Sequence, residues 1–245
     1  MVDAEIALND TKAPDIIAMT GVSFAWPGER SFRLTIDEFS LRQGTRTLLL
    51  GPSGSGKSTL LSLLCGITQP DRGSIELLGA DLTALSSAAR DRFRAEHIGI
   101  IFQMFNLLPY GSALDNVLLP LSFAAGRRAR VRGRGNEREA AEKLLRALGI
   151  EGELLSGSTA QLSVGQQQRV AAARALIGAP EIIVAAEPPS ALDSAREDAF
   201  LSLLFDQVEA AGSTLIMVSH DKSLAPRFDQ ALDLTDLISR EGPTS

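Results

Sequence analysis

The sequence contains a single cysteine, Cys65, so no disulfide can form within the chain. Such a chain fits a reducing compartment, and Cys65 itself is expected to be a buried core residue because it lies in an apolar helical segment. No apolar run approaches the roughly 18–20 residues of a membrane-spanning helix, and no charged-then-apolar signal sequence opens the chain. We therefore expect a cytosolic protein that reaches a membrane only through another polypeptide.

Lysine is also scarce, since the 24 basic residues include only four lysines, one of which is Lys57. The formal net charge is −6, which disfavours wholesale binding to nucleic acid. The densest basic stretch, residues 127–134 (RRARVRGR), has no aromatic residue that could stack on a base. We expect it to be a solvated loop, with contact to anionic lipid headgroups as a lesser alternative.

A glycine-rich run between an apolar strand-like segment and a helix start is the most informative feature present. It has the spacing GxxxxGK[ST] of a phosphate loop and consists of Gly51, Pro52, Ser53, Gly54, Ser55, Gly56, Lys57, Ser58 and Thr59. Its glycines let the backbone turn tightly, so that successive N–H groups point into a nest at the positive end of the following helix. Lys57 adds a full positive charge, and the Ser58 hydroxyl is a ligand that Mg²⁺ accepts. The run predicts a site for nucleotide phosphates.

Strand-like and helical segments alternate along the chain, which predicts a mainly parallel sheet with helices on both faces. Strands are expected at 16–26, 32–41, 47–50, 73–79, 98–102, 181–186 and 214–218, and helices at 86–97, 116–125, 137–148, 163–177 and 194–211. We expect a ragged N-terminus over 1–15 and one domain over 16–240, with a helical subdomain inserted at about 104–178.

Several polar residues follow the ends of these predicted strands. They are the phosphate loop, Gln103, Glu187 and His220. Parallel sheets bind ligands at the carboxyl ends of their strands. We therefore expect one edge of the sheet to gather these residues into a single site.

Four further motifs occur in a fixed order after the phosphate loop: residues 162–170 (LSVGQQQRV), 182–188 (IIVAAEP), 190–193 (SALD) and 218–221 (VSHD). Together they resemble the signature, Walker B, D-loop and switch-histidine motifs of the ATP-binding subunit of an ABC (ATP-binding cassette) transporter. The resemblance covers about residues 16–230. Residues 98–109 (IGIIFQMFNLLP) and 113–120 (ALDNVLLP) are similar to the branch of lipoprotein release, macrolide export and cell division.

The resemblance implies an α/β fold, the P-loop NTPase fold of ABC ATPases, with a mainly parallel core sheet, an N-terminal antiparallel β subdomain and an inserted α-helical subdomain. It also implies that ATP and Mg²⁺ bind. Lys57 and the loop N–H groups would hold the β- and γ-phosphates, while Ser58 and Gln103 would reach Mg²⁺. Glu187 would polarise the attacking water, and His220 would contact the γ-phosphate.

A second subunit is implied in the same way. Ser163 is a natural helix N-cap, and in the family this serine, with residues that correspond to Gly165 and Gln166, faces the ATP of the partner. Asp193 would line the interface of a head-to-tail dimer, which would form from two identical chains on ATP binding. Trp26 would stack on adenine, with core or rim packing as an equal alternative. Integral-membrane permease subunits would hold the dimer at the cytoplasmic face of the inner membrane.

Three positions depart from the family pattern. Ala186 replaces the Walker B aspartate, Pro189 replaces a threonine, and Val164 replaces the first glycine of the signature. The leading interpretation is an ATPase subunit that energises a transport or envelope-force complex. The alternatives are a degenerate subunit that binds ATP but hydrolyses it poorly, and a soluble ABC ATPase acting on nucleic acid or ribosomes, which the net negative charge disfavours. The cargo and the direction of transport stay open.

Overall fold

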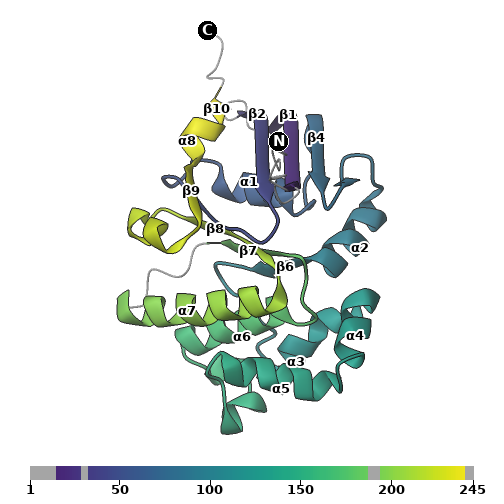
Figure 1. Ribbon diagram of the computed structural model, residues 1–245, viewed down its shortest axis with the longest axis vertical. Coiled ribbons are helices and arrows are strands. Elements are labelled where there is room, and N and C mark those ends of the chain that lie inside the picture. The colour runs from purple at the N-terminus through teal and green to yellow at the C-terminus, as the bar shows by residue number, and fades with distance from the viewer. Residues whose placement is uncertain (1–14, 29–32, 187–193, 241–245) are drawn as a thin grey trace, which may run out of the picture.

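The computed structural model describes residues 15–28, 33–186 and 194–240. Its strands form two five-stranded sheets, and α1 (Lys57–Leu64) lies between them (Figure 1). The first sheet is antiparallel and has the order β10 (Ser239–Arg240), β2 (Arg33–Arg42), β1 (Asp15–Ala25), β4 (Arg72–Leu77) and β5 (Ala80–Asp81). The second sheet is parallel and has the order β6 (Ile98–Ile101), β7 (Ile182–Ala186), β8 (Thr214–Ser219), β3 (Arg46–Leu50) and β9 (Gln230–Asp233).

The parallel sheet is covered on both faces, as the apolar runs predicted. Successive side chains of a strand point to opposite faces, and β3 divides its leucines in this way. Leu49 belongs to the hydrophobic cluster that contains α1 and the first sheet, whereas Leu48 and Leu50 belong to the cluster on the other face. The predicted architecture of a parallel core sheet beside an antiparallel β subdomain is thus present.

Most helices lie below the parallel sheet in Figure 1. They are α3 (Ala113–Leu118), α4 (Ala125–Arg132), α5 (Glu137–Ala147), α6 (Val164–Leu176) and α7 (Ser194–Ala211). Beside β6 lies α2 (Ser87–His97), and α8 (Leu234–Leu237) follows β9. Short 3₁₀ helices span Leu119–Ser122, Gly152–Leu155, Thr159–Gln161 and Lys222–Arg227. In the described part of the chain, no helix is both long and apolar enough to cross a membrane.

The helix predicted at 116–125 begins and ends earlier than expected. Ser112 and Asp115 form a capping box that starts α3 at Ala113. After Leu118 the chain continues as a 3₁₀ turn with Pro120 near its start. Proline has no N–H group for the α-helical ladder, so the regular helix stops before it.

The basic stretch 127–134 is not the solvated loop that we predicted, because most of it forms α4 and the Arg127 side chain is 2% exposed. Arg127 Nη2 donates to the backbone oxygen of Ala175 (2.8 Å) and Nε to that of Ile177 (2.8 Å), at the end of α6. Carbonyl groups at a helix C-terminus lack partners within the helix and form the negative end of its dipole. Burial lowers the pKa of Arg127 to about 10, so the guanidinium stays charged at neutral pH.

Candidate nucleotide-binding site

The glycine-rich run forms a tight loop between β3 and α1. Gly51 N donates to the oxygen of Ser219 (3.2 Å), which ties the start of the loop to the end of β8. Gly54 and Gly56 have φ of 75° and 97°. Residues with a Cβ disfavour this left-handed conformation, so glycine is needed at both positions. The loop ends at Gly56, the N-cap of α1, and the helix N-terminus therefore points into it.

The Lys57 side chain folds back over this loop. Its ammonium donates to the backbone oxygens of Gly51 (2.8 Å) and Pro52 (2.9 Å), and the residue is 8% exposed. The positive charge is therefore fixed beside the N–H groups of the loop. The full charge of the ammonium and the partial positive charge of the helix N-terminus therefore lie close together in this loop.

The space between Ser55 and Gly51 shows whether this loop fits a phosphate. Ser55 Oγ is buried and has no hydrogen-bond partner among the described residues. A Cβ on Gly51 would lie 2.5 Å from that oxygen, so the space between them is open only because residue 51 is glycine. A buried hydroxyl without a partner beside a positively charged nest is a good complement for a phosphate oxygen.

Trp26 lies beside the far end of the loop. Its indole Nε1 donates to Thr59 Oγ1 (3.1 Å), and its ring packs edge-on against Phe24 with centroids 5.0 Å apart. The side chain is 39% exposed. Trp26 is thus anchored to the core at one edge and open to solvent elsewhere, which is compatible with both alternatives, stacking on adenine and packing at the rim of the core.

Two other predicted residues, Gln103 and His220, follow strands at the same edge of the parallel sheet, but Gln103 is not adjacent to the loop. His220 follows β8, the neighbour of β3, and is exposed. Gln103 follows β6 and is also exposed, but β7 and β8 separate its strand from β3. Three strand spacings amount to roughly 14 Å. Glu187, Pro189 and Asp193 lie outside the described residues.

Asp221 fixes the chain just after His220, a role that the sequence analysis missed. Its carboxylate accepts from Ser223 N (2.8 Å) and so caps the 3₁₀ helix Lys222–Arg227, while its own N–H donates to Ser219 Oγ (3.0 Å). Hydrogen bonds from Ser223 lower the pKa of Asp221. The signal in the sequence was the residue type, because aspartate favours a hydrogen bond from the backbone N–H two residues later.

Among the described residues, the strand ends on either side of the phosphate loop do not supply the carboxylate on which a Mg²⁺ site usually relies. Ser58 offers a hydroxyl and Gln103 an amide oxygen, but Ala186 at the end of β7 offers no side-chain oxygen. Across the ranges that the structure describes, no three acidic, histidine or cysteine side chains form a group that could hold a metal ion. The phosphate loop therefore fits a phosphate better than the described residues at this edge fit Mg²⁺.

The signature segment confirms the predicted N-cap. Ser163 Oγ accepts from Gln166 N (3.4 Å), and Gln166 Oε1 accepts from Ser163 N (2.9 Å), so the two residues form a capping box at the start of α6. Val164 is half exposed. The Gln166 side chain is thus turned back onto the cap, in keeping with the S-x-x-Q spacing of a capping box, which the sequence analysis did not use.

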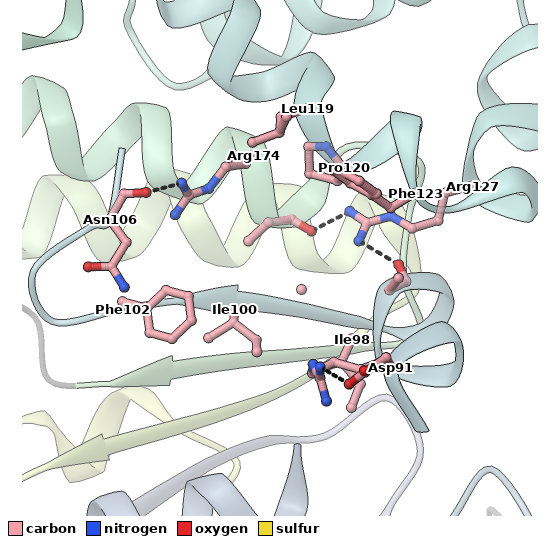
Figure 2. Close-up of a pocket in the computed structure, with 14 residues that line it drawn as sticks. Asp91, Ile98, Ile100, Phe102, Asn106, Leu119, Pro120, Phe123, Arg127 and Arg174 are labelled. Carbon is pink, nitrogen blue, oxygen red and sulfur yellow. Dashed lines mark hydrogen bonds and ion pairs between the residues drawn. The ribbon is translucent and has the colours of Figure 1, made fainter. Parts of the chain in front are cut away.

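Beside the Gln103 segment the structure has a cavity of about 540 Å³ that the sequence did not predict (Figure 2). Ile98, Ile100 and Phe102 of the β6 segment line one side, and Arg127 and Arg174 face them from α4 and α6. Leu119, Pro120 and Phe123 form the rim beyond Arg174 and Arg127 (Figure 2). The cavity thus lies between the parallel sheet and the helices below it.

Comparisons with known proteins agree with this geometry. A family profile described as "ABC transporter" matches residues 34–190. The lipoprotein-releasing system ATP-binding protein LolD of Anaeromyxobacter dehalogenans is 42% identical over 207 residues, 84% of each protein. The macrolide export ATP-binding/permease protein MacB of Rhodopirellula baltica is 39% identical over 205 residues, which is 82% of this chain but 29% of that protein.

Among solved structures, the ATP-binding cassette MJ0796, a dimer in a post-hydrolysis state bound to ADP and Pi, is similar with a TM-score of 0.74. The two are 31% identical, and the match covers 94% of this chain and 99% of that one. The resemblance drawn from the sequence motifs, including the lipoprotein-release and macrolide-export branch, is confirmed. The chain therefore belongs to the ABC transporter family, among its ATP-binding subunits.

Proposed function

We propose that this chain binds and hydrolyses ATP to drive a membrane transport or envelope-force complex, and that ATP brings two copies together. The observation that carries the proposal is the phosphate loop with Lys57 fixed over it at the carboxyl edge of a parallel sheet. Phosphoryl transfer depends mainly on positioning and charge stabilisation. Lys57 and the loop N–H groups supply both for the outer phosphates, and His220 donates a hydrogen bond from the neighbouring strand.

The second subunit completes each site in this proposal. The N-terminus of α6, with Ser163 at its cap, supplies free N–H groups for the γ-phosphate of the ATP in the other subunit. Gly165 leaves the backbone there accessible. The dimeric state of the MJ0796 cassette supports this arrangement, and we infer two identical chains with Asp193 at their interface.

We infer that an integral-membrane permease docks at the cavity beside Gln103. Its surroundings carry large exposed apolar side chains, among them Met104 (82% exposed) and Phe123 (71%). Exposed apolar side chains clustered around a cavity are typical of a site that binds another protein. MacB, by its name, combines an ATP-binding part with a permease, so a membrane partner on the cytoplasmic side fits this chain.

Glu187→Gln tests the proposed hydrolysis. We expect steady ATP turnover to fall by about 10²-fold or more, because the group that orients the attacking water loses its charge, while ATP binding and ATP-driven dimerisation persist. The rate of phosphate release and the mass of the nucleotide-bound species measure the two effects. Glu181→Gln is the matched control, since Glu181 lies before the same strand at its other end and pairs with His97 there. Tight ATP binding by the wild type without turnover would instead support the degenerate alternative.

Ala186→Asp tests the metal position. Mg²⁺ usually relies on one or two carboxylates, so we expect wild-type turnover to be slow and to need high Mg²⁺. The aspartate should lower the Mg²⁺ concentration for half-maximal turnover by about tenfold. A Mg²⁺ titration at fixed ATP measures this, with Ala186→Asn as the uncharged control of the same shape. Equal rates for wild type and Ala186→Asp at low Mg²⁺ would show that Ala186 does not limit metal binding.

A further inference from the structure

The chain takes an unusual backbone path just after Gln103. Phe105 and Asn106 are consecutive residues with φ of 58° and 50°. Left-handed backbone is tolerated by asparagine but is unfavourable for phenylalanine, and it persists only where surrounding contacts fix it. The segment therefore needs an external restraint.

Arg174 supplies that restraint from the last turn of α6. Its Nη1 donates to the oxygen of Asn106 (2.6 Å) and its Nη2 to the oxygen of Phe105 (2.5 Å). The forked guanidinium thus bonds both of the left-handed residues at once. Partial burial lowers the pKa of Arg174.

The same side chain connects three parts of the proposed machinery. First, α6 is a rigid element of 13 residues that begins at the signature cap Ser163 and carries Arg174 in its last turn. Second, the bonded segment follows Gln103 directly. Third, Arg174 and Asn106 both line the cavity, where they face each other in Figure 2.

We propose that Arg174 is a positioning residue that makes the segment after Gln103 move together with α6. This inference rests on the proposed ATP-driven dimerisation, because the α6 N-terminus matters only if it faces the ATP of a second subunit. Arg174 contacts no nucleotide in this proposal and acts only through the segment that it holds.

Arg127 provides a matched control within the same cavity. Its guanidinium also lines the cavity and donates to backbone oxygens, but these belong to Ala175 and Ile177 at the end of α6 and to Ala95 of α2. Arg127 is buried, whereas Arg174 is partly exposed. Arg127 therefore secures the end of α6 without contacting the segment after Gln103. Comparing variants of the two arginines therefore separates a general loss of stability from a loss of the coupling between α6 and the segment after Gln103.

The experiment uses the full chain with Glu187→Gln, which we expect to bind ATP without turning it over, as the parent of Arg174→Gln, Arg174→Lys and Arg127→Gln. Fluorescence of Trp26, the single tryptophan, reports ATP binding. Sedimentation reports the ATP concentration at which half of the protein is dimeric, and hydrogen exchange reports the Phe105 amide, which donates to Phe102 O.

For Arg174→Gln we expect unchanged ATP affinity, faster exchange at Phe105 and a dimerisation midpoint raised about tenfold in ATP. Arg174→Lys keeps the charge but has a single donor nitrogen in place of the fork, so its dimerisation midpoint should lie between those of the parent and Arg174→Gln. It remains informative if the glutamine variant does not fold. Arg127→Gln should lower the thermal midpoint and leave the dimerisation midpoint unchanged. Wild-type exchange and dimerisation in both Arg174 variants, or an equal dimerisation defect in Arg127→Gln, would overturn the proposal. Failure of the parent itself to bind ATP or dimerise would contradict the proposed function instead.

Discussion

Lys57→Ala is expected to weaken ATP binding by about 3 kcal/mol, or roughly 100-fold. The ammonium is nearly buried and is fixed over the loop by the Gly51 and Pro52 oxygens, at 2.8 and 2.9 Å. A phosphate bound there would accept charge-assisted hydrogen bonds, which are about twice as strong as neutral ones. Alanine removes this charge and leaves the Gly51 and Pro52 oxygens without their donor.

Titration of ATP with Trp26 fluorescence or calorimetry measures this loss. Lys143→Ala is the matched control, because Lys143 is an exposed lysine on α5, far along the chain from the loop. It should bind ATP as the wild type does. If Lys57→Ala bound ATP with wild-type affinity, the loop would not be the phosphate site, and the central assignment would be wrong.

The loop and the sheet edge were predictable because their signals are local. Gly54 and Gly56 mark left-handed backbone by residue type alone, and an apolar strand directly before them places the loop at a strand end. The capping box of Ser163 and Gln166 is also contained within four residues. Short-range chemistry of this kind depends little on the rest of the fold.

The cavity and its two arginines were not predictable, because their contacts join distant parts of the sequence. Arg127 bonds a residue 50 positions later, and Arg174 bonds one 69 positions earlier. From composition alone, an arginine-rich stretch is predicted to be solvated. In the folded chain an arginine can nevertheless be buried if its guanidinium donates to the carbonyl groups at a helix C-terminus. The left-handed Phe105 has no local signal either, since phenylalanine is not a residue that favours that conformation.

The short elements after residue 229 were missed for a different reason. β9 has four residues and β10 two, and α8 is a single turn. Periodicity needs longer windows to separate a strand from a helix. β9 is placed by its parallel pairing with β3 and not by its own pattern. The roles of Glu187 and Asp193, and the domain limits at 16, 104, 178 and 240, stay predictions.

Gly99→Ala is expected to lower stability more than any other single methyl addition that we consider. Gly99 lies in β6 directly against the end of α6, and a Cβ there would lie 2.2 Å from the oxygen of Ala175 and 2.7 Å from Ile183 Cδ1. The isoleucine methyl can turn away, but the backbone oxygen moves only with α6. Overpacking of this kind costs about 3 kcal/mol, which corresponds to a thermal midpoint roughly 6–12 °C lower for a chain of this size.

The displaced oxygen also bonds Arg127 Nη2 (2.8 Å), so the substitution should loosen the arginine that closes the end of α6. Thermal unfolding followed by circular dichroism measures the midpoint. Gly133→Ala is the matched control, because Gly133 has φ of −64° and its added Cβ would come no nearer than 3.4 Å to Ala129 O. That control should match or slightly exceed the wild type, since alanine restricts the unfolded chain. If Gly99→Ala and Gly133→Ala had the same thermal midpoint, β6 and α6 could move apart at little cost. The close contact between Gly99 and Ala175 would then not restrict which residue can occupy position 99.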